Sequence, residues 1–553
     1  MENLTIFLKD LNKSVSVKNE IELHSITKEF NIKKDSPIVL GRFNNDIYEL
    51  SHIADIDGEF EAITTREDIG KRTYERSLQF VLIKAAYKIF EQCDVCIEHS
   101  LSGGLFCEIH KNTSLTEEEI KLLENEMRRI IEKDIRIVKV NLEREKAIEI
   151  FKGYGMGDKV EFLEGLSMDR VNLYKLEDRY DYFYGPMVYS TGVLKVFELK
   201  IYNGGLIIRF PNLKEPNSLT KYVEYKKLAN IYKETNDWGN ILKVPTLGAL
   251  NKLIDKKGLH DMVLINEGLH EKKLAYIADS IKHKESVKLV LIAGPSSSGK
   301  TTFTKRLSIQ LAVNGLVPIQ ISMDDFFVDR ELTPKDENGQ YDFESVHALD
   351  IKLFNSTLKK ILDGEAAELP SFNFITGKRE WKGHKVSLPK NGVILIEGIH
   401  ALNEIMTSSI EKDEKFKVYI NCFTQLNIDN HNRIPTTDVR MVRRIVRDSL
   451  IRGYSGEDTL KMWPSIKRGE KKNIFVYQEE ADVLFNSNLV YELCMLKKYA
   501  IYELKKIKKD SPVYYEALRL ISFLKFFRDG EIGMIPSNSI LKEFVGGSCF
   551  YDY

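Results

Sequence analysis

The sequence predicts a multidomain protein that combines α/β and α+β architecture. Over residues 285–490, short apolar strands alternate with helical patterns, which is typical of a parallel sheet. Over residues 1–210, strands, a hairpin and amphipathic helices follow one another without that regular alternation, which indicates a small β-rich module and then an α+β region. The 553 residues are enough for three or four domains at roughly 150 residues each.

We divide the chain into five segments on these patterns. The connecting region looks helical, with a polar break expected at 236–239, and no repeat or low-complexity tract interrupts the chain. The segments are a β-rich domain (1–62), an α+β domain (63–212), a helical connector (213–284), a parallel α/β domain (285–490) and a helical C-terminal extension (491–553).

Composition excludes several classes of protein. The chain has 81 Lys+Arg against 82 Asp+Glu, a net charge of -1, which argues against a protein that mainly coats nucleic acid or anionic membrane. Six cysteines are too few for a secreted disulfide scaffold. The N-terminus lacks the pattern of a signal peptide, and no stretch approaches the ~18 apolar residues of a membrane span. We therefore expect a soluble cytoplasmic protein with no membrane association.

Local patterns in the α+β region are clear. Apolar residues recur at helical spacing in Ser77–Phe90, and residues 95–110 predict a hairpin. A second helix is expected over Leu115–Lys133, opened by a capping box of Thr116 and Glu119. These patterns predict helices packed on an antiparallel sheet.

A group of cysteines and histidines in the hairpin has zinc-like spacing. It comprises Cys93, Cys96, His99, Cys107 and His110. Successive residues of a strand point to opposite faces of its sheet, so these side chains would not converge on one ion. We therefore favour a hairpin with small buried cysteines over a metal site.

The strongest motif is a phosphate-binding loop (P-loop) between a predicted strand, Lys288–Ala293, and a predicted helix, Thr301–Val313. It fits G-x-x-x-x-G-K-[ST], in which glycines let backbone N–H groups face phosphate oxygens at a helix N-terminus. Lys300 is expected to bridge the β- and γ-phosphates, and the Thr301 hydroxyl to hold Mg²⁺. The residues expected to bind ATP are Gly294, Pro295, Ser296, Ser297, Ser298, Gly299, Lys300, Thr301 and Thr302.

Two acidic positions follow the next apolar strands. Asp324-Asp325 closes Val317–Met323, and Glu397 follows Val393–Ile396. Ligands of a parallel sheet bind at the carboxyl ends of its strands, where a carboxylate can accept a proton or support Mg²⁺. We favour this interpretation over solvated loop acids, with Asp324, Glu397 and Thr301 as the metal-binding residues.

Five arginines lie in a predicted helix over 440–453. Guanidinium groups on one helix face could close over phosphates as a lid, and the alternative is a solvated face paired with acids. Next to a P-loop, the lid is the favoured interpretation. The arginines are Arg440, Arg443, Arg444, Arg447 and Arg452.

Together these motifs resemble the uridine kinase/phosphoribulokinase family over about 285–490. The resemblance rests on the P-loop, Ser322–Phe327, Tyr341–Glu344, Ile396–Ile399 and Arg443–Asp448. It implies a P-loop kinase that uses ATP and Mg²⁺, with Asp324 as general base beside Lys300. It also implies that Arg447 and Arg452 contact phosphate, and that the acceptor is bound by Phe327, Tyr341, Glu344, Phe372 and Arg444.

The acceptor side departs from the uridine kinase pattern. Phe327 stands where that family has Tyr, Glu344 where it has Asp, and Gly377 where a histidine is expected. The second lid arginine of the family is replaced by Tyr454. Several polar groups that would recognise uridine are therefore missing, although the ATP site is intact.

The first 210 residues resemble a different family. Residues 1–60 look like a TGS domain, and 70–210 look like the editing domain that follows it in threonyl-tRNA synthetase, on the pieces Arg76–Phe80, Asp181–Val188 and Ser190–Gly192. That family's editing residues are histidines and a cysteine, so the resemblance implies a fold kept without its chemistry. The residues at those positions are Arg76, Phe80, Phe183 and Met187.

The sequence thus predicts a kinase that phosphorylates a hydroxyl of a small acceptor, with a nucleoside as first choice. The alternatives are a sugar-phosphate kinase and an RNA-linked regulatory ATPase, and a GTPase ranks last because no Asn-Lys-x-Asp motif is present. A small-molecule acceptor is the expected partner, with RNA as the weaker option. The acceptor's identity, a homo-oligomeric state and the role of the C-terminal tail stay open.

Overall fold

A parallel sheet forms the centre of the P-loop part, residues 285–490. The structure is a computed structural model that describes residues 3–335, 339, 341–424 and 426–551. The five strands are β15 (Leu289–Ala293), β16 (Val317–Ser322), β19 (Gly392–Glu397), β20 (Lys415–Asn421) and β23 (Val483–Asn486). They are all parallel, in the order β16-β19-β15-β20-β23, which confirms the predicted α/β class. Their carboxyl ends therefore meet at one edge.

Helices cover this sheet because its central strand is apolar throughout. All five side chains of β15 are buried, as expected for a strand packed on both faces. The P-loop part also contains α9 (Lys300–Val313), α10 (Ile351–Leu362), α11 (Thr436–Arg447) and α12 (Gly456–Asn473), and the short pairs β17 (Ala367–Asn373) with β18 (Lys378–Val386) and β21 (Asn427–Asp429) with β22 (Asn432–Arg433). Helix α9 begins at Lys300, one residue before the predicted start.

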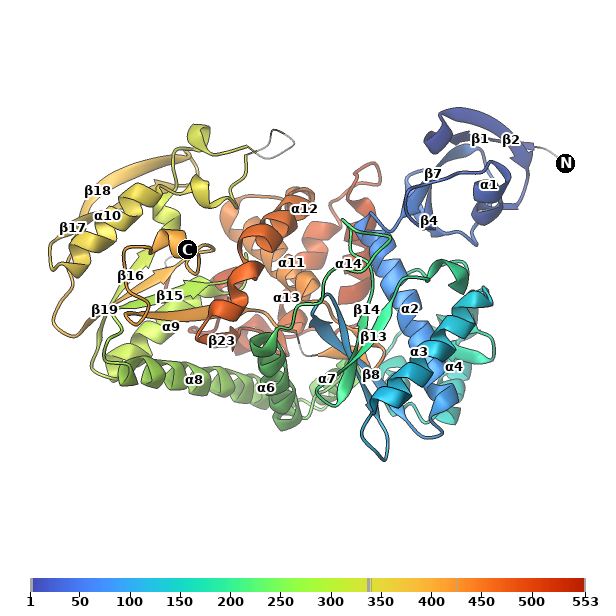
Figure 1. The fold of residues 1–553 in the computed structure, drawn as a ribbon, viewed down its shortest axis with the longest axis horizontal. Helices are drawn as coiled ribbons and strands as arrows, with labels where there is room; N and C mark the ends of the chain where they lie inside the picture. Colours follow the sequence, from blue (N-terminus) through green and yellow to red (C-terminus); the bar gives the residue numbers. More distant parts are fainter. Residues whose placement is uncertain (1–2, 336–338, 340, 425, 552–553) are drawn as a thin grey trace.

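The N-terminal β-rich domain forms a separate lobe (Figure 1). Its main sheet has the order β2-β1-β7-β4-β5, in which β1 and β7 are parallel and the other pairs antiparallel. Helix α1 and a small second sheet complete it. The elements are β1 (Asn3–Leu8), β2 (Lys13–Lys18), β3 (Ile21–Glu22), α1 (Leu23–Glu29), β4 (Ile38–Phe43), β5 (Asp46–Glu49), β6 (Ile53–Ala54) and β7 (Gly58–Thr64).

The α+β domain has two antiparallel sheets, β13-β14-β9-β8 and β10-β11-β12. The predicted hairpin is confirmed as β8 and β9, and the capping box of Thr116 and Glu119 is formed at the start of α3. The elements are α2 (Asp68–Ile89), β8 (Asp94–Leu101), β9 (Gly104–His110), α3 (Glu117–Glu132), β10 (Val138–Glu143), α4 (Arg144–Gly153), α5 (Gly157–Glu164), β11 (Arg170–Leu176), β12 (Arg179–Asp181), β13 (Glu198–Tyr202) and β14 (Gly205–Arg209).

The connector is helical, but the break expected at 236–239 is wrong. It consists of α6 (Lys226–Leu242), α7 (Leu247–Asp255) and α8 (Leu259–His283), and α6 runs through the polar residues without interruption. The reason is that its buried side chains keep helical spacing, while the polar residues lie on other faces. The buried positions near that point are Ile231, Thr235, Gly239 and Leu242.

The first part of the C-terminal extension lies between the α+β domain and the sheet of the P-loop part (Figure 1). It contains α13 (Glu492–Leu504), α14 (Tyr514–Leu524) and α15 (Lys542–Val545). One continuous apolar cluster includes Phe151 and Phe162 of the α+β domain, Leu307 of α9 and Phe523 of α14. The largest core thus crosses the segment boundaries. Within the described ranges, none of the helices has the length and apolarity needed to span a bilayer.

A buried ion cluster also joins the two halves. Lys159 Nζ lies 2.9 Å from a carboxylate oxygen of Asp181 and 2.8 Å from one of Asp429, and these three side chains are at most 1% exposed. His431 Nδ1 lies 2.7 Å from the other oxygen of Asp181. Although burial alone would raise the pKa of Asp181, the charges of His431 and Lys159 hold it below its ordinary value.

Candidate functional site

The P-loop connects β15 to α9 at the carboxyl edge of the sheet. A Cβ atom at Gly294 would lie 2.0 Å from the carbonyl oxygen of Ile420, so no side chain fits there. Gly299, just before the helix, has a φ of 86°, which favours glycine. Lys300 Nζ donates a hydrogen bond to the Pro295 carbonyl at 3.1 Å, across the mouth of the loop. The local geometry is that of an anion-binding helix N-terminus.

Three side chains with oxygen atoms, from α9, β16 and β19, lie close together beside the loop. The Thr301 hydroxyl donates to Glu397 Oε1 at 3.3 Å, and the Ser322 hydroxyl, at the end of β16, approaches the same atom at 3.4 Å. Asp324 follows Ser322 in a short 3₁₀ turn. Burial, reinforced by the charge of Asp324, raises the pKa of Glu397 to about 7. Two neighbouring carboxylates with a hydroxyl fit Mg²⁺, which takes oxygen ligands and usually only one or two protein carboxylates.

The arginines of α11 brace the P-loop from one side. Arg440 Nε donates to the Ser296 carbonyl at 3.0 Å, and Arg444 donates to the Ser296 hydroxyl at 2.6 Å. Arg443 is fully buried and donates to the Ser297 carbonyl at 3.3 Å. This side of the predicted lid therefore touches the loop itself.

The last two arginines lie further along. Arg447 pairs with Asp448 at 2.8 Å. Arg452 ends the following π-helical turn, Asp448–Arg452, where its charge interacts with those of Arg447, Asp448 and Asp324. Arg452 is exposed and lies within electrostatic range of Asp324, the carboxylate expected to act as base.

Aromatic rings gather on the acceptor side of Asp324. The ring centroid of Phe327 lies 5.6 Å from that of Phe372 and 6.3 Å from that of Phe374. The amide of Phe372 donates to Asp325 at 3.2 Å, which ties β17 to the end of β16. Tyr341 lies apart from this group, 5.9 Å from the ring of Phe343, and is exposed.

Glu344 is a half-buried acid that packs against Gly469 of α12. Burial, with the nearby charge of Glu470, raises the pKa of Glu344 to about 7. Its Oε2 atom is buried and has no hydrogen-bond partner among the described residues. The charges of Arg444 and Lys300 lower its pKa and that of Asp324 raises it, so the predicted acceptor residue lies within electrostatic range of the expected catalytic groups.

Sequence reasoning missed three glutamates around the loop. Glu470 of α12 accepts the Ser296 amide hydrogen at 3.0 Å, and Glu543 of α15 accepts that of Thr302 at 3.0 Å. Glu492 of α13 pairs with Arg443 at 2.6 Å. Each lies in an otherwise ordinary helical stretch and far along the chain from its partner, so no local pattern could have identified it.

The positions expected for an editing site also come together. Phe80 and Phe183 pack with their ring centroids 5.1 Å apart, and Met187 Sδ lies 3.8 Å from the Ser77 hydroxyl. Arg76 donates to the Pro186 carbonyl at 2.7 Å. Phe80, Phe183 and Met187 thus make packing contacts, and Arg76 makes a hydrogen bond to a backbone carbonyl. No three His, Cys, Asp or Glu side chains converge as a metal cage in the parts of the chain that the structure describes.

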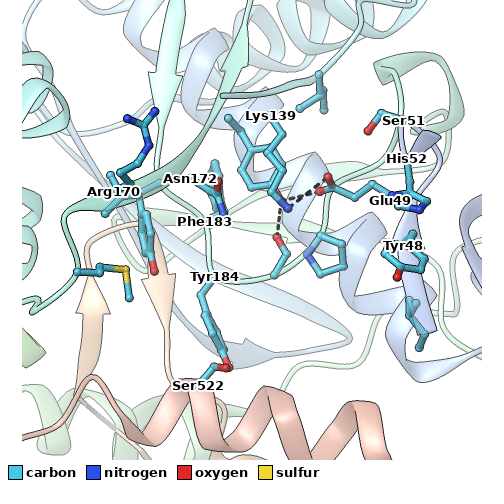
Figure 2. Close-up of a pocket in the computed structure, with 18 of the residues that line it drawn as sticks. Tyr48, Glu49, Ser51, His52, Lys139, Arg170, Asn172, Phe183, Tyr184 and Ser522 are labelled. Atoms are coloured by element: carbon cyan, nitrogen blue, oxygen red, sulfur yellow. Dashed lines mark hydrogen bonds and ion pairs between the residues drawn. The ribbon is translucent and has the colours of Figure 1, made fainter. Parts of the chain in front are cut away.

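A cavity of about 1220 Å³ lies beside these residues, between the β-rich domain, the α+β domain and α14. Figure 2 shows Glu49 and Lys139 facing each other, 3.5 Å apart, with Phe183 and Tyr184 on the wall and Ser522 of α14 next to the end of the Tyr184 side chain. Glu49 also accepts the Met187 amide hydrogen at 2.9 Å. The residues that line the cavity come from the β-rich domain, the α+β domain and the C-terminal extension, and not from the P-loop.

The cysteine hairpin is a packing unit. The ring of His99 stacks on that of Tyr232 with centroids 3.7 Å apart, and Cys107 is fully buried. Burial raises the pKa of Cys93 to about 11 and that of Cys96 further. The thiols therefore stay neutral, and the stacked imidazole of His99 joins this hairpin to α6.

The P-loop, Asp324 and Glu397 thus share one edge of a parallel sheet. Residues 289–491 match the Phosphoribulokinase / Uridine kinase family. Solved structures similar to the chain include a putative fructose transport system kinase from Silicibacter sp. TM1040, 18% identical with a TM-score of 0.27, covering 38% of this chain and 98% of that one. A possible uridine kinase from Bacillus stearothermophilus is 19% identical with a TM-score of 0.26, covering 39% and 100%.

The N-terminal part has different relatives, so the chain is a composite of two architectures. The threonine–tRNA ligase of Caldanaerobacter subterraneus subsp. tengcongensis is 28% identical over 197 residues, 35% of this chain and 30% of that protein. That of Desulforamulus reducens is 31% identical over 160 residues, 29% and 25%. The chain thus spans less than a third of the length of these relatives.

The raised pKa of Glu397 predicts that MgATP binding depends on pH. Because a proton competes with Mg²⁺ for a carboxylate whose pKa is about 7, we expect MgATP to bind roughly tenfold more weakly at pH 6 than at pH 8. Glu397→Gln removes this carboxylate, so the affinity of this variant for MgATP should be nearly the same at the two pH values. Calorimetric titration at both pH values measures the effect.

Glu344→Gln is the matched control, because the pKa of Glu344 is also about 7. That variant should keep the pH dependence of MgATP binding. The role of Glu397 would be contradicted if the unsubstituted protein bound MgATP equally well at pH 6 and pH 8. It would also be contradicted if only Glu344→Gln lost the pH dependence.

Proposed function

We propose that the protein is an ATP-dependent kinase that transfers the γ-phosphate to a hydroxyl of a nucleoside. One observation carries this proposal. The P-loop and the carboxylates of Asp324 and Glu397 lie at one edge of the sheet, and a group of phenylalanines lies next to them. Phe327 and Phe372 lie directly beyond Asp324 and Asp325. The family match of residues 289–491 supports phosphoryl transfer in general.

The proposed reaction assigns one task to each group. Asp324 accepts the proton of the acceptor hydroxyl while the hydroxyl oxygen attacks the γ-phosphorus, and the bond to the bridging oxygen breaks so that ADP leaves. Lys300 neutralises charge on the β- and γ-phosphates, and Arg452, whose charge interacts with that of Asp324, stabilises the transferring group. Thr301 and Glu397 would hold Mg²⁺, which supplies charge neutralisation at the phosphates.

The acceptor side favours a nucleoside over a sugar phosphate. A nucleobase can stack between aromatic rings, and three phenylalanines lie within 6.3 Å of one another by ring centroid. A sugar phosphate needs cations with donors to spare, but the arginines near this side already have partners. Arg379 pairs with Asp350 at 3.0 Å, and Arg330 donates to the Phe374 carbonyl at 2.6 Å.

An acceptor screen tests the proposal. Nucleosides and sugar phosphates are added singly with MgATP, and ADP release is followed together with the phosphorylated product. We expect at least one nucleoside to stimulate turnover well above the rate without acceptor, and sugar phosphates not to do so. Stimulation only by a sugar phosphate would reassign the acceptor, and no stimulation by either class would remove the main support for a kinase.

The RNA-linked ATPase alternative predicts the opposite behaviour. Transfer RNA should then accelerate ATP hydrolysis without any phosphorylated small product. We expect no such acceleration, because the positions of the editing residues are filled by packing between Phe80, Phe183 and Met187.

A further inference from the structure

The C-terminal chain folds back onto the P-loop. Figure 1 shows the C-terminal end over the sheet of the P-loop part, far from α14 in the fold. Ser539, Ile540, Leu541 and Phe544 are fully buried there. A Cβ atom at Gly299 would lie 2.5 Å from Ile540 Cγ2, so this segment sits directly on the loop.

Glu543 makes the decisive contact. Its Oε2 atom accepts hydrogen bonds from the Thr302 amide at 3.0 Å and from the Thr302 hydroxyl at 2.9 Å. The phenol of Tyr551 lies 3.2 Å from the same hydroxyl. Glu543 is 8% exposed and Thr302 is not exposed at all, so water has little access to this contact.

Neighbouring groups respond to this carboxylate. The charge of Glu543 contributes to the raised pKa of Glu397, behind burial and Asp324. Phe544, the next residue, lies under the guanidinium of Arg443 at 5.1 Å from its ring centroid. Glu543 therefore interacts electrostatically with one of the residues expected to hold the metal.

A carboxylate and a phosphate compete for such a position. The first amides of the helix after a P-loop point their hydrogens at an anion, and an ionised acceptor strengthens such a bond. Glu543 supplies that anion from the same chain. A nucleotide phosphate cannot take the Thr302 amide while Glu543 holds it, and the two negative charges would repel each other.

We propose that residues 539–551 are an autoinhibitory segment that occupies the P-loop and must leave before a nucleotide binds. This goes beyond kinase activity and rests only on the ATP site of the proposed function. The apparent affinity for ATP is reduced by the fraction of molecules in which the segment has left. Weakening the Glu543 contact raises that fraction.

Glu543→Gln tests the proposal, since it keeps the shape of the side chain and removes its charge. A neutral acceptor gives a bond about half as strong as a charged one, so we expect roughly tenfold tighter MgATP binding to the full chain by calorimetric titration. The control is Glu531→Gln, an exposed glutamate of the same extension, whose affinity should stay within about twofold of the unsubstituted protein. Equal affinities of all three proteins would overturn the proposal and leave the ATP site intact.

Hydrogen exchange in the unsubstituted protein gives a second readout that needs no variant. Saturating MgATP should speed amide exchange in peptides covering 539–551, because the segment is displaced. Slower exchange there would show a segment that closes over bound nucleotide, which overturns autoinhibition. Binding of ATP to none of the proteins would instead remove the ATP site of the proposed function, and this inference with it.

Discussion

Asp324→Asn is expected to lower kcat for acceptor-dependent ATP consumption by roughly 10²–10⁴-fold. A positioned general base contributes about that much, and asparagine keeps the shape of the side chain but cannot take the proton. Asp324 lies in the turn after β16, beside Glu397 and within the field of Arg452. Initial rates are measured with the nucleoside that gives the strongest ADP release.

Two measurements separate this loss from a damaged site. ATP affinity by calorimetry should fall far less than kcat, because the P-loop, Thr301 and Glu397 remain in place to hold MgATP. The control is Asp325→Asn, which removes the neighbouring acid. Asp325 accepts a hydrogen bond from the Phe372 amide, and its substitution should lower kcat less than tenfold. Retention of full turnover by Asp324→Asn would show that the proton leaves by another route.

Lys159→Met is expected to destabilise the whole protein by about 3–5 kcal/mol. Removal of one partner from a buried ion pair leaves uncompensated charge, and Lys159 is the shared partner of Asp181 and Asp429. The loss should appear as a lower midpoint of urea unfolding. The pKa of Asp181 lies below its ordinary value, so its stabilising contribution is present at neutral pH and is lost as the pH falls towards that depressed value.

Lys152→Met provides the comparison, because Lys152 is an exposed lysine on the nearby α4. It should shift the unfolding midpoint only slightly. Adding Asp429→Asn to Lys159→Met should cost less than the sum of the two single changes, since both act on one network. Equal midpoints for Lys159→Met and Lys152→Met would refute a stabilising role for the cluster.

Features that depend on neighbouring residues were predictable from the sequence. The strand before the P-loop, the helix after it and the strands that precede Asp324 and Glu397 are local apolar runs bounded by turn residues. The structure confirms these elements, although β16 ends at Ser322, two residues before Asp324. The capping box of α3 is equally local. The error at 236–239 arose because polar side chains on the outer faces of α6 resemble a loop when burial is unknown.

Features that depend on distant partners were not predictable. The Glu543–Thr302 bond joins residues 241 positions apart, and the Glu470–Ser296 bond joins residues 174 apart. Nothing in a stretch such as Lys542–Val545 marks its glutamate as a ligand for a backbone amide. Only the path of the chain through the fold decides that contact.

The continuous core has a consequence for how such a protein can change during evolution. Phe151 and Phe162 from the synthetase-like part pack in the same cluster as Leu307 behind the P-loop and Phe523 of the extension. The synthetase-like part and the P-loop part therefore share one core and are not interchangeable modules. A recombination event that replaced one piece with a homologue would have to bring matching side chains for the other, so substitutions on the two sides of this seam must be inherited together.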